Sequence, residues 1–201
     1  RQLCIRDRRS AMYAEMIRVL AAMHSVNIDA VGLSEFGKPG NYFERQIGRW
    51  SKQYRAAETG TIDAMEQLLV WLPANLPADD GKVSLVHGDY RLDNMMFHPT
   101  EPRILAVVDW ELSTLGHPYA DLAYQWMQWR LPPGGSLSGL YGHDRKALGI
   151  PTEQEYVARY CERMGIDQIE HWTFYLAFSF FRLAAILQGV KKRALDGNAS
   201  S

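Results

Sequence analysis

Residues 86–94 read VHGDYRLDN, and residues 107–111 read VVDWE. In both stretches a short apolar run is followed at once by acidic or amide side chains. Short apolar runs rich in Val are typical of strands, and the end of a strand holds polar groups rigidly at the rim of a core. The two stretches therefore predict two polar clusters, each fixed at the end of a strand.

The side chains in these clusters suit phosphoryl transfer. One carboxylate can accept or orient the proton of an acceptor hydroxyl. An amide oxygen and a second carboxylate can hold Mg²⁺, which prefers oxygen ligands. A cation held there would neutralise the charge that develops on the phosphates in the transition state.

The rest of the chain predicts mostly helix around this insert. Strands are expected at 82–86, 95–97 and 104–108, and the last is a continuous apolar run that we expect to be buried. Apolar residues at helical spacing predict five helices, at 12–23, 43–54, 62–73, 119–127 and 172–190. Thr152 with Glu155 forms a capping-box pattern that predicts a sixth helix at 152–164, and the stretch 131–149, rich in Pro and Gly, is expected to be loop. The expected fold class is α+β, mostly helical, with a small β insert that carries the catalytic loop.

Composition narrows the function classes. A chain of 201 residues suits one domain or one large lobe, and its net charge of −1 gives no reason to expect nucleic acid or an anionic membrane as a partner. Cys4 and Cys161 lie far apart without metal-ligand spacing, which fits a reducing cytoplasm. The longest apolar run, 172–187, is interrupted by Ser179 and Arg182, so no membrane span is expected.

The pattern His-Gly-Asp-x-x-x-x-Asn, followed by two apolar residues and Asp109, resembles the catalytic loop and metal-binding Asp of protein kinases. Gly88 in place of Arg, and Trp-Glu after Asp109, make it more similar to the aminoglycoside phosphotransferase and choline kinase-like family. Residues 115–123, LGHPYADLA, match that family's G-x-P-x-x-D-L-A segment. The resemblance is closest to the kinase-like domain associated with acyl-CoA dehydrogenases and to its free-standing bacterial relatives. It implies a protein-kinase-like C-terminal lobe.

The resemblance also implies roles for individual residues. Asp89 takes the place of the catalytic base, and Asn94 and Asp109 take the place of the Mg²⁺ ligands. Met96 occupies a position that packs under the adenine of ATP. Arg91 would touch the transferred phosphate, although it could instead only pair with a nearby carboxylate such as Asp93.

Three further residues are expected to support the site. His87 would orient the catalytic loop rather than act as the base. Asp121 matches a family Asp that hydrogen-bonds the backbone of that loop. Glu111 could assist either the metal site or the acceptor site, and the sequence does not separate the two.

The resemblance also suggests what the chain lacks. No Gly-rich phosphate loop of the kinase type and no strand Lys of the V-A-I-K type occurs in the sequence. We therefore expect residues 1–201 to form the C-terminal lobe of a phosphotransferase, with 82–123 as its catalytic and metal-binding core and the ATP-clamping N-terminal lobe absent. Alone, this chain should fold but be inactive.

The expected function is ATP- and Mg²⁺-dependent transfer of a phosphoryl group to the hydroxyl of a small molecule, with a hydroxyacyl compound as one candidate acceptor. The alternatives are an aminoglycoside O-phosphotransferase, a non-catalytic pseudokinase or docking lobe, and a metal-dependent phosphohydrolase. In the last, His87, Asp89, Asp109 and His117 would ligate two metals. A homo-oligomer is also possible.

Overall fold

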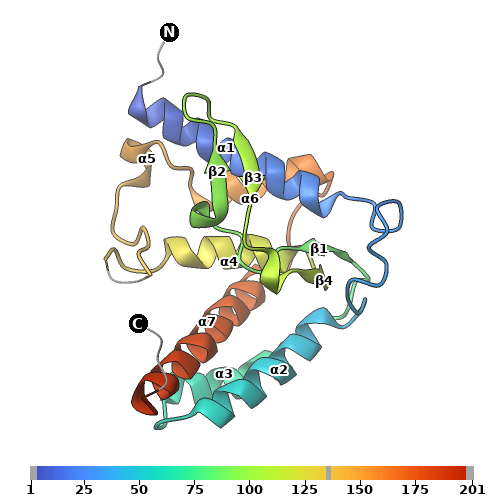
Figure 1. The fold of residues 1–201 in the computed structure, drawn as a ribbon, viewed down its shortest axis with the longest axis vertical. Helices are drawn as coiled ribbons and strands as arrows, with labels where there is room; N and C mark the ends of the chain where they lie inside the picture. Colours follow the sequence, from blue (N-terminus) through green and yellow to red (C-terminus); the bar gives the residue numbers. More distant parts are fainter. Residues whose placement is uncertain (1–3, 135–136, 198–201) are drawn as a thin grey trace.

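The computed structural model describes residues 4–134 and 137–197 (Figure 1). The helices are α1 (Ile5–His24), α2 (Tyr42–Ala57), α3 (Asp63–Ala74), α4 (Tyr119–Trp129), α5 (Arg145–Leu148), α6 (Glu153–Met164) and α7 (Trp172–Leu195). The strands are β1 (Ser84–Val86), β2 (Met95–Phe97), β3 (Ile104–Val107) and β4 (Thr114–Gly116), and two 3-10 turns are η1 (Leu92–Asn94) and η2 (Trp110–Leu112). The expected α+β, mostly helical fold class is confirmed.

The long helix α7 connects two groups of helices. It packs against α2 and α3 on one side and against α4 on the other, while α1 packs against α6 (Figure 1). In Figure 1 the β2–β3 hairpin lies in front of α1, and the short β1–β4 pair lies between the two groups. The predicted catalytic insert is thus held where the two helical groups meet.

Two antiparallel pairs make up the β structure. β1 pairs with β4, with Ser84 opposite Gly116 and Val86 opposite Thr114. β2 pairs with β3, with Met95 opposite Val107 and a register shift between Met96 and Phe97. Each pair is a two-stranded ribbon, so each depends on the helices for its stability.

The core is built from the predicted helical stripes. All four residues of the second stripe are buried, namely Phe43, Ile47, Trp50 and Tyr54. The third helix departs slightly from the prediction, because it continues through Pro73 to Ala74 and buries only Met65 and Leu72. The 131–149 segment, expected to be loop, contains the one-turn helix α5.

The prediction that 104–108 is a buried strand is wrong. In the described part of the chain β3 has β2 as its single partner, and one face of this ribbon rests on α1. The other face is open, which leaves Leu105 and Val108 exposed together with Met96 on β2. A continuous apolar run predicts a strand whose two faces are both covered by other elements. Here the described residues cover only one face of β3.

Helix α7 bears on the expectation that the chain has no membrane span. By length and composition alone it could cross a membrane, with a mean hydropathy of 1.4 over its most apolar stretch, despite Ser179 and Arg182. In the structure 56% of that stretch is buried within the chain, and a buried core helix passes the same composition test. The hydropathy of α7 therefore reflects its central place in the core.

Helix α6 begins with the capping box that the sequence predicts. The Thr152 hydroxyl accepts from the backbone N–H of Glu155, and the Glu155 carboxylate accepts from the backbone N–H of Thr152. Gly165 ends the helix with a left-handed backbone.

Removing this cap tests its contribution. In the full-length protein, Thr152→Ala should destabilise the α6 terminus by about 1 kcal/mol, because an N-terminal backbone N–H loses its partner. Hydrogen exchange of the α6 amides should speed up accordingly. Thr152→Ser, which keeps the hydroxyl, is the matched control, and equal exchange in both variants would contradict the assignment.

Candidate active site

Strand pairing brings the two predicted polar clusters together. Asn94 immediately precedes β2, and Asp109 follows two residues after β3 ends at Val107. Met95 lies opposite Val107, and the backbone N–H of Val108 donates to the carbonyl of Asn94 at 2.9 Å. Asn94 and Asp109 are therefore held on neighbouring segments at one end of the hairpin.

Asp89 is fixed against Asn94. The side-chain amide nitrogen of Asn94 donates at 2.9 Å to both the backbone carbonyl and the Oδ2 of Asp89. Asn94 itself is buried, whereas the Asp89 side chain keeps 15% exposure. Because its nitrogen faces Asp89, the amide oxygen of Asn94 points away from that carboxylate, where it can serve as a ligand.

Asp109 adopts an unusual backbone conformation. Its φ of 67° and ψ of 58° are left-handed, a region that costs most non-glycine residues roughly 1–2 kcal/mol and that Asp tolerates better than most. The turn directs the chain from β3 into η2 and leaves Asp109 exposed. Strain of this kind concentrates at functional sites.

The imidazole of His87 ties the two clusters to each other. Its Nδ1 accepts from the backbone N–H of Asp89 at 3.2 Å, and its Nε2 lies 3.0 Å from the carbonyl of Val108. A ring whose Nδ1 accepts must carry its proton on Nε2, which can then donate to Val108. Trp110 packs on the same ring at 4.7 Å between centroids. This geometry matches the loop-orienting part that the resemblance implies for His87.

Gly88 allows the η2 segment to approach the catalytic loop. Its φ is +84°, and a Cβ at this position would lie 2.6 Å from the carbonyl oxygen of Leu112 in η2. A side chain there would need both a strained backbone and a displaced η2 turn. The Gly that separates this motif from the protein-kinase pattern thus has a steric cause.

Asp121, in the first turn of α4, holds the catalytic loop from beneath. Its carboxylate accepts from the backbone N–H of His87 at 2.7 Å and of Gly88 at 2.8 Å. His24 approaches the same carboxylate at 3.3 Å through Nε2, and its Nδ1 lies 2.8 Å from the Tyr160 hydroxyl. Asp121 is completely buried, and these donors offset the cost of burying its charge.

Arg91 lies closer to Asp89, the candidate base, than to Asp93. Its Nε lies 3.3 Å from Oδ2 of Asp89 and 3.8 Å from Oδ2 of Asp93. Neither contact has hydrogen-bond geometry, and the buried Nε is left without a partner in the described chain. Such loose pairing leaves the guanidinium available to an anion.

Met96 and Glu111 lie on the open surface around these loops. Met96 is 56% exposed on β2, and Glu111 is exposed in η2. Leu92, Leu105, Trp110 and Leu112, in the same loops and hairpin, are exposed as well. The predicted adenine contact of Met96 and the predicted task of Glu111 stay predictions.

Three residues outside the predicted set, namely Tyr124, His24 and Trp110, contact or support the site. Tyr124 lies beside Asp89: burial, together with the Asp89 carboxylate, raises the pKa of Tyr124 to about 12. Tyr124 follows Asp121 by three residues and so shares its face of α4, which is the signal that could have found it. His24 contacts Asp121, which is 97 positions away in the sequence. Trp110 packs on His87, which is also distant in the sequence.

The donor set fits one hard cation better than a two-metal centre. Asn94 and Asp109 offer oxygen ligands of the kind that Mg²⁺ prefers. Within 4–134 and 137–197, no group of three or more His, Cys, Asp or Glu side chains could hold a metal. Both ring nitrogens of His87 are engaged, and so are those of His117, by Asp80 and by the backbone N–H of Tyr119. The phosphohydrolase arrangement is therefore not supported.

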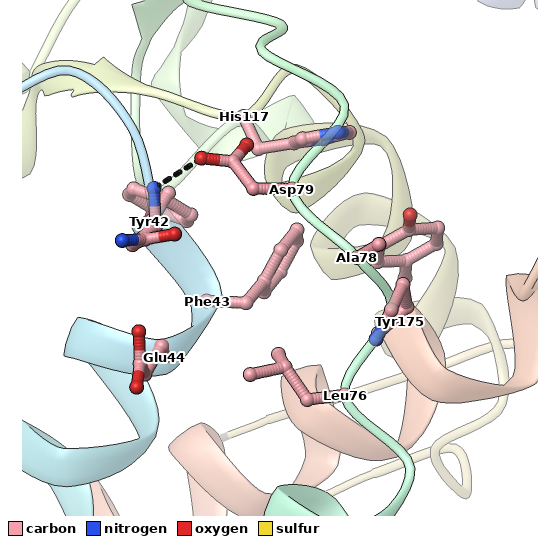
Figure 2. Close-up of a pocket in the computed structure, with 10 residues that line it drawn as sticks. Tyr42, Phe43, Glu44, Leu76, Ala78, Asp79, His117 and Tyr175 are labelled. Atoms are coloured by element: carbon pink, nitrogen blue, oxygen red, sulfur yellow. Dashed lines mark hydrogen bonds between the residues drawn. The ribbon is translucent and has the colours of Figure 1, made fainter.

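A separate cavity of about 280 Å³ lies at the other end of the β1–β4 pair (Figure 2). The catalytic loop follows Val86, whereas His117 follows Gly116, which pairs with Ser84 at the far end of the ladder. The lining includes Tyr42, Phe43, Leu76, Asp79, His117 and Tyr175. In Figure 2 the Asp79 carboxylate accepts from the backbone N–H of Asn41 at the start of α2, a cap supplied by a distant segment. None of the predicted catalytic residues lines this cavity.

The fold and the candidate site agree with the family to which comparison assigns this chain. The chain belongs to the phosphotransferase enzyme family, whose model matches residues 5–158. Among its relatives, acyl-CoA dehydrogenase family member 10 of Mus musculus is 55% identical over 196 residues, which cover 97% of this chain and 18% of the relative. Acyl-CoA dehydrogenase family member 11 of Homo sapiens is 44% identical over 194 residues, covering 96% of this chain and 25% of the relative. The chain thus spans a quarter or less of these curated relatives.

Solved structures agree on the fold. A crystal structure from Ralstonia eutropha, which carries a provisional aminoglycoside phosphotransferase assignment, has a TM-score of 0.93 and 55% identity, covering all of this chain and 63% of that one. A type VIII aminoglycoside-3'-phosphotransferase has a TM-score of 0.64 at 15% identity, covering 88% of this chain and 62% of that one. At that identity the second likeness concerns the fold alone. The predicted family resemblance is confirmed.

Replacing Asp121 tests the support beneath the catalytic loop. In the full-length protein, Asp121→Asn presents an amide NH₂ to groups that donate, so the buried network should lose about 1–3 kcal/mol. Hydrogen exchange at the amides of His87 and Gly88 should accelerate by roughly 10-fold or more.

Asp167→Asn is the matched control, because Asp167 is exposed. It should leave the exchange of both amides unchanged. Unchanged protection of His87 and Gly88 in Asp121→Asn would show that another group holds the loop.

Proposed function

We propose that this chain is the catalytic lobe of an ATP- and Mg²⁺-dependent phosphotransferase that transfers the γ-phosphate of ATP to a hydroxyl of a small molecule. One observation carries the proposal. Asp89 and Asn94 are hydrogen-bonded to each other, and Asp109 lies on the neighbouring segment, tied in through His87. A candidate base, a candidate amide ligand and a second carboxylate thus come from adjoining segments.

In the proposed reaction Asp89 accepts the proton of the acceptor hydroxyl. The hydroxyl oxygen forms a bond to the γ-phosphorus, and the bond from phosphorus to the bridging oxygen breaks, so that ADP leaves with the electron pair. Asn94 and Tyr124 hold the Asp89 carboxylate in place while it receives the proton. Such positioning and charge stabilisation supply most of the catalysis in phosphoryl transfer.

Asn94 and Asp109 would hold the cation. A bound Mg²⁺ would neutralise charge on the phosphates. Arg91, loosely paired with Asp89, would turn its guanidinium to the transferred phosphoryl group. The exposed apolar surface around Met96 would lie against the adenine and beneath an N-terminal lobe supplied by the longer protein. On this proposal the isolated chain binds nucleotide weakly and turns over little.

An aminoglycoside phosphotransferase is the second candidate, because the Ralstonia eutropha structure carries that provisional assignment at 55% identity. Aminoglycosides are polycations and call for a cleft lined by carboxylates. Beside Asp89 and Tyr124 the structure instead places two arginines, Arg91 and Arg182. The charge near the base therefore favours an acceptor that is not a polycation, and a hydroxyacyl compound is one such acceptor.

The base assignment is tested in the full-length enzyme. Asp89→Asn should lower kcat by about 10²-fold or more, since an amide cannot take the proton, while the affinity for ATP changes little. Steady-state kinetics with the best acceptor found by screening would measure this.

Asp93→Asn is the matched control, because Asp93 is 78% exposed and lies in the same turn. It should keep kcat within about 3-fold of the parent enzyme, as expected for a surface change. Near-normal kcat in Asp89→Asn would rule out Asp89 as the base.

The metal assignment is tested by structure and by titration. A complex with nucleotide and Mg²⁺ should place oxygens of Asn94 and Asp109 at about 2.0–2.2 Å from a cation. Asp109→Ala should raise the Mg²⁺ concentration needed for half-maximal activity by at least about 10-fold, because a charged ligand is lost. A cation held by other residues, with Asp109 in solvent, would refute the assignment.

A further inference from the structure

Arg182 is the only charged residue between Trp172 and Val190 in the apolar helix α7. It is only 6% exposed, and its Nε is buried without a hydrogen-bond partner. Among residues 4–134 and 137–197 it takes part in no salt bridge. Among the described residues this nearly buried guanidinium therefore has no direct ion-pair partner.

Aromatic rings surround this guanidinium. Its central carbon lies 5.0 Å from the centroid of the Tyr124 ring and 5.6 Å from that of Trp50. Arg49 lies over the same Trp50 ring at 5.5 Å, so the neighbourhood carries a second positive charge. Cation–π contacts stabilise a desolvated cation, but by less than its removal from water costs. The rings offset only part of that cost.

The unpaired cation lies close to the candidate base. Tyr124 is common to both groups, with Arg182 against its ring and Asp89 beside its hydroxyl. Tyr42 is a further neighbour: burial raises the pKa of Tyr42 to about 12, and Arg182 acts against that rise. Asp89 and Arg182 thus both lie beside the Tyr124 side chain, so the candidate proton acceptor and the buried positive charge are near neighbours.

We propose that Arg182 binds an anionic group of the acceptor, a carboxylate or a phosphate ester, while the acceptor's hydroxyl lies at Asp89. The hydroxyl and the anion would then both lie beside Tyr124. A buried guanidinium is suited to this, because its planar fork binds carboxylate and phosphate oxygens in pairs. The inference rests on the proposed phosphotransferase function and narrows its acceptor to anionic hydroxy compounds.

The rate arm of the test uses the full-length enzyme with ATP and Mg²⁺. The probes are 3-hydroxybutyrate, 6-hydroxyhexanoate and glycerol 3-phosphate, each beside its neutral counterpart 1,3-butanediol, 1,6-hexanediol or glycerol, together with kanamycin as a polycation. At least one anionic probe should have a kcat/KM about 10-fold or more above that of its neutral counterpart. The carboxylate and phosphate probes separate the two sources of the anion.

Variants test whether Arg182 causes that preference. Arg182→Met should raise KM for the preferred anion by about 10- to 100-fold with a smaller change in kcat, because one charged hydrogen-bonding partner is lost. KM for the neutral counterpart should change less than about 3-fold. Arg182→Lys should fall between, since it keeps the charge but loses the fork. Arg193→Met, on the exposed end of the same helix, is the matched control and should match the parent enzyme.

Calorimetry separates failure of this inference from failure of the proposed function. The three anions are titrated into parent and Arg182→Met protein with ADP and Mg²⁺ present, without any need for turnover. A dissociation constant in about the millimolar range that weakens by 10-fold or more in Arg182→Met supports the inference, even if no acceptor is phosphorylated.

Three results would overturn the inference: no binding of any anion up to about 50 mM, equal binding by both proteins, or transfer that prefers the neutral probes or kanamycin. The melting temperature of Arg182→Met should stay level or rise, because replacing an unpaired buried charge by an apolar side chain is neutral or stabilising. A large fall would mean that Arg182 serves the core, and would overturn the inference as well.

Discussion

The carboxylate of Asp121 is the constraint on which the catalytic loop depends. It is completely buried at the start of α4 and accepts the backbone N–H groups of His87 and Gly88. Those two amides belong to a left-handed turn that forms no ladder of its own, so without Asp121 they would be buried donors with no acceptor. Because α4 packs on α7, the loop is anchored to the centre of the helical core.

Contacts with this anchored loop then fix the position of the segment from Val108 to Leu112. Gly88 lacks a side chain, so the carbonyl of Leu112 can lie where a Cβ would otherwise be. His87 then reaches across to the carbonyl of Val108, and strand pairing fixes Asn94 next to Val108. The base and both candidate ligands are thereby placed through backbone contacts, which tolerate little displacement. Two short ribbons suffice for this because each is fixed beside the loops that carry these candidate residues.

Sequence reasoning recovered the parts that local patterns encode. Helical periodicity found the buried face of α2, and the capping box found the start of α6. Motif spacing brought Asp89, Asn94 and Asp109 into one hypothesis, and the structure places the three on adjoining segments. What the sequence could not supply was contact between distant segments. The link from His24 to Asp121 joins residues 97 positions apart, and no local pattern reports it. The prediction that the apolar run of β3 is buried was wrong for a related reason. Hydrophobicity indicates that a surface needs cover, but not whether the same chain provides it.

Two buried charged side chains near the catalytic loop, Asp121 and Arg182, have opposite surroundings. Asp121 is surrounded by donors, as burial of a charge ordinarily requires. Arg182 is nearly as buried, yet it lies against two aromatic rings and has no direct ion-pair partner among the described residues. Removing such a charge would cost the fold little, since an apolar side chain of similar length would fill the same space. A lone guanidinium in an otherwise apolar helix, one ring away from the candidate base, is therefore poorly explained by stability and well explained by a ligand that brings the missing negative charge.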